Sequence, residues 1–262
     1  MNTRRSSQFK VNGHTRLLRI TGRLVWLAGE ILLAGMGYIV HAPFRGSALL
    51  PTTRALWLQR HCRRVLRVFN VSLQTTGVIP ARGLLVCNHL SYLDILVIGA
   101  LAPAAFVAKR EMRNWPVLGW FAMLAGTVFV HRGKRSEVTR STAEIKEVLR
   151  QGTLLVLFPE GTSSGGDTVL PFKSALLEPA AEQKQPLAAG CIQYSLSDGS
   201  VADEVCYWRD MTLVPHLVNL LGKRGVSARV SFTQLQNGCG DRKQLARQLH
   251  SEVVRLKEAF SI

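Results

Sequence analysis

The chain has 262 residues, of which 47% are hydrophobic and 7% aromatic, so it is long and apolar enough to bury a sizeable core. This composition excludes an intrinsically disordered chain and a fibrous repeat protein. Thirty-three Lys and Arg against 17 acids give a net charge of +16, which indicates an anionic partner: nucleic acid, an acidic membrane or a phosphorylated substrate. The five cysteines show neither C-x-x-C nor metal-ligand spacing, so we expect free thiols and no metal site.

The positive charge is concentrated in the first third of the chain. Residues 1–93 contain 13 Lys and Arg and one acid, Glu30. These bases are interleaved with Leu, Val and Gly rather than with aromatic residues. That pattern favours lipid head groups over nucleic acid as the anion, although a non-enzymatic basic binding module stays open at this point.

Residues 1–14 are polar and basic and are predicted to be a disordered tail. Residues 24–40 are a 17-residue apolar run that contains Glu30 and three glycines. This length is at the lower limit for a helix that spans a bilayer, so we expect a membrane-embedded or re-entrant anchor, with a buried core helix as the alternative. The arginines that flank the run support the anchor; they are Arg16, Arg19 and Arg23 before it and Arg45 after it.

Residues 53–69 are predicted to form a second helix with an apolar stripe at helical spacing. The stripe consists of Leu58, Cys62, Val65, Leu66 and Phe69, and the arginines Arg60, Arg63, Arg64 and Arg67 lie largely off it. Such a helix can lie in the head-group layer with its arginines on lipid phosphates, or it can be an ordinary domain helix with a solvated basic face. We interpret residues 15–70 as a helical membrane-anchor element and residues 71–262 as a separate domain.

From residue 71 onward, short apolar runs alternate with helical patterns, which predicts an α/β fold with a mixed, largely parallel sheet flanked by helices. The predicted strands are Gly83–Cys87, Ala105–Ala108, Thr127–Val130, Thr153–Phe158, Pro186–Tyr194, Val205–Trp208 and Ala228–Phe232. The predicted helices are Asp94–Leu101, Val117–Leu124, Ser136–Arg150, Ser174–Ala181, Pro215–Leu221 and Arg242–Glu258.

The segment N-H-L-S-Y-L-D at 88–94 follows the first strand of this domain. Because strand ends deliver polar groups to a crevice, His89 is expected at the end of the strand and Asp94 at the start of the next helix. A carboxylate that accepts a hydrogen bond from one imidazole nitrogen leaves the other nitrogen as a base. The alternative is that Asp94 is a helix cap and His89 an ordinary loop residue.

The segment F-P-E-G-T-S-S-G-G at 158–166 follows another apolar strand. Glu160 could bind a substrate hydroxyl or stabilise the loop, and the Gly/Ser backbone could hold an anion. Residues 161–165 also match G-x-S-x-G, and His216 follows acids between Asp198 and Asp210, as in an α/β-hydrolase. That pattern would make Ser163 a nucleophile, but no helix follows the serine as the motif requires.

A third segment, G-T-V-F-V-H-R-G-K-R at 126–135, ends a predicted strand with a basic cluster. Arg132, together with Lys173 of the P-F-K-S segment, could hold a phosphate. The alternative for Lys134 and Arg135 is that they are solvated bases in front of a helix.

These blocks together resemble the glycerolipid acyltransferase family, which contains the 1-acyl-glycerol-3-phosphate acyltransferases. The N-H-x-x-x-x-D segment is similar to the family's catalytic motif, G-x-x-x-x-x-R at 126–132 to its second block and F-P-E-G-T at 158–162 to its third. V-A-K-R-E-M at 107–112 and P-F-K at 171–173 also fit. The resemblance covers roughly residues 75–215.

The resemblance implies direct transfer of an acyl chain from a thioester of acyl carrier protein or coenzyme A to a lysolipid hydroxyl, with no further cofactor and no metal. His89 would be the general base, and Asp94 would orient it. The substrate-binding residues that it implies are Asn88, Lys109, Arg132, Glu160, Gly161, Thr162 and Lys173. It also implies attachment to an anionic inner membrane, facing the cytoplasm, through a two-helix element that corresponds to residues 15–70.

The sequence departs from the family pattern at the acceptor site. Ser163 stands where the family usually has an arginine after F-P-E-G-T, and Ala175 stands where it often has glycine. Loss of a charge-assisted contact to a phosphate removes about 1.5–3 kcal/mol. The resemblance still favours 1-acyl-glycerol-3-phosphate as the acceptor, but a lyso-ornithine lipid or another lysolipid becomes a serious alternative.

Overall fold

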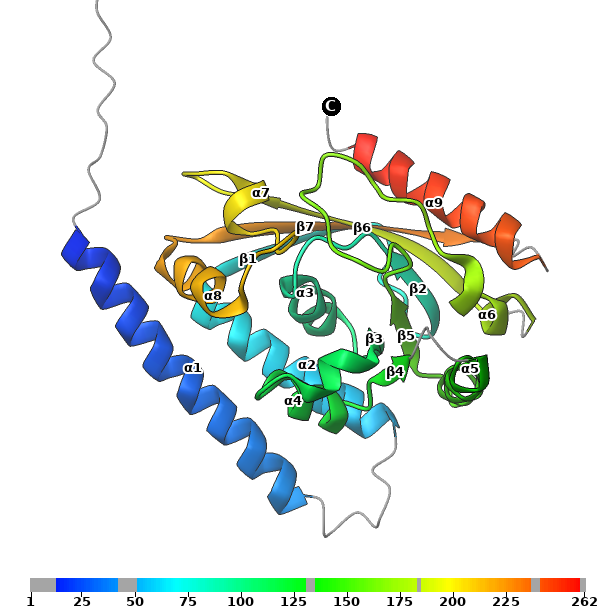
Figure 1. Ribbon diagram of the computed structural model, residues 1–262, viewed down its shortest axis with the longest axis horizontal. Coiled ribbons are helices and arrows are strands. Elements are labelled where there is room, and N and C mark those ends of the chain that lie inside the picture. Colours follow the sequence, from blue (N-terminus) through cyan, green and yellow to red (C-terminus); the bar gives the residue numbers. More distant parts are fainter. Residues whose placement is uncertain (1–12, 42–50, 131–134, 183–184, 237–240, 260–262) are drawn as a thin grey trace, which may run out of the picture.

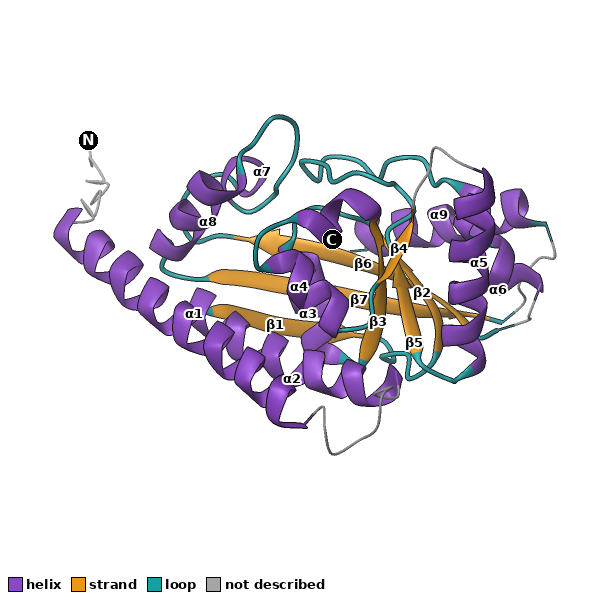
Figure 2. Cartoon of the chain, turned by 60° about the horizontal axis from the view of Figure 1, so that its bottom comes forward, coloured by secondary structure: helices purple, strands orange, loops and turns teal. Residues whose placement is uncertain are grey.

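The computed structural model describes residues 13–41, 51–130, 135–182, 185–236 and 241–259. In these ranges one seven-stranded sheet has the order β1-β7-β6-β2-β5-β3-β4 (Figures 1 and 2). Every neighbouring pair is parallel except β6 and β7. The predicted α/β fold with a mixed, largely parallel sheet is therefore confirmed. The strands are β1 (Val71–Thr76), β2 (Gly83–Cys87), β3 (Ala104–Lys109), β4 (Val128–Val130), β5 (Leu154–Leu157), β6 (Leu187–Ser195) and β7 (Val226–Leu235).

Helices cover both faces of the sheet. The α-helices are α1 (Gly13–His41), α2 (Pro51–Phe69), α3 (Leu93–Leu101), α4 (Leu118–Leu124), α5 (Arg135–Arg150), α6 (Glu178–Glu182), α7 (Val201–Glu204), α8 (Leu213–Gly222) and α9 (Arg242–Glu258). Two short 3-10 turns are η2 (Arg110–Asn114) and η3 (Ser174–Leu176).

The central strand β2 shows how the sheet divides the core into two layers. Its side chains alternate between the two faces, as in any strand. Leu84 and Val86 belong to a cluster with residues of α5 and α9, whereas Leu85 and Cys87 belong to a cluster with residues of α2, α3 and α8. All five residues of β2 are buried, because both faces are covered.

The predicted N-terminal helices are present, but α2 is a core helix. The apolar stripe of α2 faces inward: Cys62, Leu66 and Phe69 are buried in the core cluster, and Leu58 and Val65 pack against it. Figure 1 shows α1 outside α2, and helix α1 begins at Gly13, inside the predicted disordered tail. Residues 1–12 lie outside the described part of the chain. Among the helices of the described part, none combines the length and hydropathy that crossing a membrane requires.

Three arginines of α1 that are predicted to lie beside a membrane contact α8 in the structure. Arg19 donates to the carbonyl oxygen of Gly222 at 2.8 Å, and Arg23 donates to that of Leu221 at 2.9 Å. Arg16 donates to an asparagine side chain of the same helix. The last carbonyls of a helix lack partners within it, so these guanidinium groups satisfy them and hold α1 in place.

Two arginines of α2 are also used inside the molecule. Arg63 donates to the carbonyl oxygen of Ala100, in the last turn of α3, at 2.8 Å. Arg64 forms an ion pair with Glu30 of α1 at 2.5 Å, and its hydrogen bond is the main reason that the pKa of Glu30 lies below its ordinary value. Arg45 lies outside the described residues.

The sequence-based elements differ from the structure at several places. The predicted strand Val205–Trp208 is wrong: this segment is a loop whose Tyr207 amide donates to the carbonyl oxygen of Leu90 at 2.8 Å. Strand β1 was not predicted, because only two of its six residues are apolar. The predicted helix Ser174–Ala181 is divided into η3 and α6.

Candidate active site

The parallel strands β2, β5 and β6 bring their carboxyl ends to one edge of the sheet. His89 follows β2, Glu160 follows β5, and Tyr194 is near the end of β6. Crevices at this edge are the usual binding sites of open α/β sheets. The structure thus brings together two of the sequence motifs, the one at 88–94 and the one at 158–162.

His89 and Asp94 form a hydrogen-bonded pair. The His89 Nδ1 lies 2.7 Å from Asp94 Oδ2, and the same oxygen accepts from the backbone amides of Leu90 at 2.7 Å and Ser91 at 2.9 Å. The other carboxylate oxygen, Oδ1, accepts from the Tyr194 hydroxyl at 2.7 Å. Asp94 is fully buried, and four donors compensate for the burial of its charge.

The ring of His89 is fixed by packing as well. It stacks on Phe158, with 4.4 Å between ring centroids and 20° between the planes. Since Asp94 binds Nδ1, the ring is held as the tautomer whose Nε2 can accept a proton. No described residue forms a hydrogen bond with Nε2, and the side chain keeps 22% exposure. The arrangement suits a general base that opens on a cavity.

Glu160 holds two separate pieces of backbone. Its Oε1 accepts from the His89 amide at 2.9 Å, and its Oε2 accepts from the Leu170 amide at 3.2 Å. Burial raises the pKa of Glu160 to about 7. Gly161 follows with φ of +74°, a conformation that favours glycine, which turns the chain sharply after the carboxylate. Glu160 therefore connects the end of β2 to the far side of its own loop.

Asn88 also bonds to backbone. Its Oδ1 accepts from the Ile192 amide at 2.7 Å, and its Nδ2 donates to the Ile192 carbonyl oxygen at 3.0 Å. The side chain is buried, so it joins the end of β2 to β6. Its predicted contact with substrate stays a prediction.

A cavity of about 240 Å³ opens in front of His89. Gly161, Thr162 and Ser163 line one side, and Lys109 lies at the end of β3 on another. Three of the predicted substrate-binding residues, Lys109, Gly161 and Thr162, thus lie on this cavity. Apolar side chains such as Leu157 form much of the remaining wall, which suits an acyl chain.

Neither of the other two predicted cations is among the described residues that line the cavity. Arg132 lies outside the described residues. Lys173 is exposed and does not line the cavity, and its backbone amide donates to the Pro159 carbonyl oxygen at 2.9 Å. Both remain predicted substrate contacts.

Among the described residues, Ser163 has no histidine partner of the kind that a serine nucleophile needs. Its hydroxyl donates to the carbonyl oxygen of Tyr207. His216, the histidine expected of a hydrolase, has both ring nitrogens in other hydrogen bonds, to the Tyr92 hydroxyl at 3.0 Å and to the Cys206 carbonyl oxygen at 3.0 Å. Within the described ranges no hydrogen bond joins Ser163 to His216, so the geometry gives the hydrolase hypothesis no support.

Sequence reasoning missed Tyr194, Phe158 as a stacking partner, and the aromatic pair Tyr92 and Tyr207 on the cavity. A signal existed for Tyr194, which is the last residue of a predicted strand. Parallel strands that end together would have placed its hydroxyl beside the 88–94 motif. Tyr207 had no such signal, because its segment was predicted to be a strand.

Comparisons with known proteins agree with this geometry. The acyltransferase family profile matches residues 70–193. A lyso-ornithine lipid O-acyltransferase of Pseudomonas aeruginosa is 34% identical over 246 residues, covering 90% of this chain and 92% of that protein. The chain belongs to the acyltransferase family. The lyso-ornithine lipid O-acyltransferase of Brucella abortus is 37% identical, covering 75% of this chain and 80% of that enzyme.

Relatives named for 1-acyl-glycerol-3-phosphate, the acceptor that the sequence resemblance favours, are also found. A 1-acyl-sn-glycerol-3-phosphate acyltransferase of Neisseria meningitidis is 33% identical, covering 65% of this chain and 68% of its own. The crystal structure of the 1-acyl-sn-glycerophosphate acyltransferase PlsC from Thermotoga maritima superposes with a TM-score of 0.68, covering 94% and 97% of the two chains at 20% identity, and so has the same fold. The family assignment made from the motifs is confirmed: this is a lysolipid acyltransferase.

Proposed function

We propose that the chain transfers an acyl group from an acyl thioester to the hydroxyl of a lyso-ornithine lipid at a membrane surface. The observation that carries the choice of acceptor is the position and bonding of Ser163. In the family that the motifs resemble, this position usually holds an arginine that helps to bind the acceptor phosphate. Here it is a serine whose hydroxyl donates to the carbonyl oxygen of Tyr207. The lyso-ornithine relatives described above support the same choice, with coverage of up to 90% of this chain.

The reaction needs one base and one attacking hydroxyl. His89 Nε2 takes the proton of the acceptor hydroxyl while its oxygen attacks the thioester carbonyl carbon. The new C–O bond forms, the C–S bond breaks, and the proton passes from His89 to the departing sulfur. Asp94 stabilises the imidazolium that exists between these two steps, since its charge is buried 2.7 Å from Nδ1.

Among the described residues, the charges around the cavity suit a zwitterionic head group better than a phosphomonoester. A phosphomonoester carries about −1.5 to −2 charges at neutral pH. Among the described lining residues, Lys109 is the only permanently charged side chain. Ornithine in an N-acylated lipid carries one carboxylate and one ammonium group, which sum to zero, so a single lysine is enough to meet its carboxylate.

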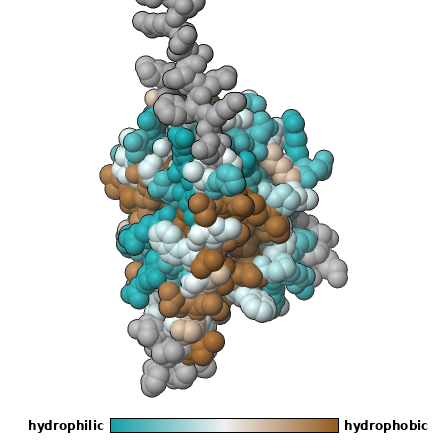
Figure 3. Space-filling view, turned by 90° about the vertical axis from the view of Figure 1, so that its left-hand side faces the viewer, coloured by the Kyte–Doolittle hydropathy of each residue, from teal (hydrophilic) through white to brown (hydrophobic). Residues whose placement is uncertain are grey.

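The outer face of α1 supports action at a membrane surface. Leu18, Val25, Leu32 and Ile39 recur every seventh residue and so lie on one side of the helix, each at least 66% exposed. Figure 3 shows apolar side chains gathered on the face along which α1 runs. An amphipathic helix of this kind binds in the plane of a membrane rather than across it.

The acceptor proposal is tested with a panel of lysolipids and one acyl-carrier-protein donor, scored by release of free thiol. We expect turnover with lyso-ornithine lipid, loss of it in His89→Ala, and a gain of activity on 1-acyl-glycerol-3-phosphate in Ser163→Arg. Preference of the unaltered enzyme for 1-acyl-glycerol-3-phosphate would refute the proposed acceptor. Full activity of His89→Ala would refute the mechanism.

A further inference from the structure

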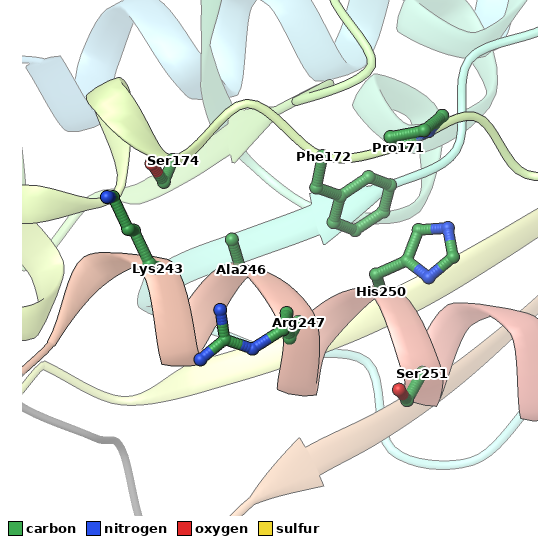
Figure 4. Close-up of a pocket in the computed structure, with 8 residues that line it drawn as sticks. All are labelled: Pro171, Phe172, Ser174, Lys243, Ala246, Arg247, His250 and Ser251. Carbon is green, nitrogen blue, oxygen red and sulfur yellow. The ribbon is translucent and has the colours of Figure 1, made fainter.

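A second cavity lies away from His89, between α9 and the segment that leads into η3. Its volume is about 550 Å³, and its walls include Pro171, Phe172 and Ser174 on one side and α9 on the other (Figure 4). Figure 4 shows His250 of α9 pointing toward Phe172, and the two rings meet edge to face with centroids 5.0 Å apart. The cavity is an open groove with an aromatic end.

The α9 side of this groove carries two bases without ion-pair partners. Lys243 and Arg247 are exposed, lie one turn apart, and form no ion pair with any residue of the described part. Other arginines of α9 are paired, as Arg242 is with Glu178 at 2.8 Å. The acid beside the groove, Asp241, caps α9 through the amides of residues 243 and 244, and these bonds together with the charges of Arg247 and Lys243 lower its pKa. Its one negative charge offsets only part of the two positive charges. The groove therefore presents a net positive face.

One turn of chain separates the groove from the catalytic cavity. Ser174 lines the groove, and Leu176, two residues later in η3, lines the cavity in front of His89. The neighbouring residues connect the two sites as well. His250 is hydrogen-bonded to the carbonyl oxygen of Val169 at 3.3 Å, and the next amide, that of Leu170, donates to Glu160.

We propose that the protein that carries the acyl donor docks in this groove. It is a small acidic carrier protein to which the acyl chain is attached as a thioester through a flexible arm. The two unpaired bases would meet carboxylates one helical turn apart on the carrier. The arm would then cross η3 and deliver the thioester carbonyl to His89. This inference rests on the proposed function in one respect: that the donor is an acyl thioester.

The test compares two donors in the same variants of the full chain. Charge reversal of both bases, Lys243→Glu with Arg247→Glu, is expected to raise the KM for acyl-carrier protein about tenfold. The KM for acyl-coenzyme A and the KM for the lysolipid should not change. A control pair, Arg82→Glu with Arg224→Glu, changes the net charge equally at exposed positions that do not line the groove, and it should leave all three values unchanged.

Each other result overturns the docking proposal. An equal rise with both donors would mean that the groove binds a part common to them, and no rise would mean that it does not bind the donor. Direct binding of unacylated carrier, measured by fluorescence anisotropy, should weaken about tenfold in the double variant. That readout separates the two proposals, because it does not depend on turnover of any lysolipid.

Discussion

Tyr194→Phe tests whether the fourth donor to Asp94 matters for catalysis. Burial, followed by the charge of Asp94, raises the pKa of Tyr194 well above its ordinary value, so the hydroxyl keeps its proton and donates. The variant removes one hydrogen bond of 2.7 Å to a buried carboxylate, a bond worth about 1.5–3 kcal/mol. We expect the free energy of unfolding to fall by about that amount. If half of that loss reaches the transition state, the barrier rises by about 0.75–1.5 kcal/mol and kcat falls about four- to twelvefold.

The assay is kcat with saturating donor and acceptor, together with urea unfolding of the same samples. KM for the acceptor should change little, because Tyr194 does not line the cavity. Tyr38→Phe makes the same chemical change on α1, where the hydroxyl accepts a 3.5 Å bond from Arg54, and it should leave kcat unaltered. Unchanged kcat and unchanged stability in Tyr194→Phe would refute the reasoning that Asp94 needs a donor on Oδ1.

Three further predictions concern the support of the site. Because the pKa of Glu160 is raised to about 7 in the fold, its contribution to stability is present below its ordinary pKa and is lost as the pH rises to about 7. Between pH 4.5 and 8 the free energy of unfolding, measured with urea, should fall by about 2–3 kcal/mol because of Glu160, and this fall should be absent in Glu160→Gln. If the variant loses as much stability over this pH range, the raised pKa does not belong to Glu160. Glu30→Gln removes the ion pair with Arg64, so amide exchange in α1 should become several-fold faster while β2 keeps its protection. Gly165→Ala puts a Cβ 2.6 Å from the Trp208 ring, so the free energy of unfolding, measured with urea, should fall by about 1–3 kcal/mol. An unchanged free energy of unfolding would show that the loop moves to accommodate the methyl group.

The motif residues were predictable because their spacing carries the chemistry. A histidine after a buried strand and an acid five residues later were expected to pair, and His89 and Asp94 do so at 2.7 Å. Tyr194 lies one hundred residues away from Asp94. The strand that ends at Tyr194 was predictable, but that it lies directly beside β2 depends on the strand order, which no local pattern specifies.

For the N-terminal arginines the sequence predicts lipid contacts, and the structure shows that several of them have partners within the chain. Many arginines next to an apolar run are typical of a membrane-binding segment, and the exposed apolar residues on the outer face of α1 support such a segment. Yet Arg19, Arg23 and Arg63 bond to the last carbonyls of α8 and α3. Composition cannot distinguish a lipid phosphate from a helix C-terminus, since both offer negative charge to a guanidinium group.

The hydrogen bonds around His89 explain how the proposed base can stay fixed while the residue at position 163 changes. His89 is held through Asp94 by residues of its own motif and by β6, and its amide is held by Glu160 at the end of β5. None of these bonds involves Ser163, whose hydroxyl bonds to the 205–208 loop instead. Substitution at position 163 can therefore alter the charge that faces the acceptor without moving Nδ1 of His89 from Asp94. Ser163→Arg should change acceptor preference while kcat on the preferred acceptor stays within about threefold, which is less than 1 kcal/mol in the barrier.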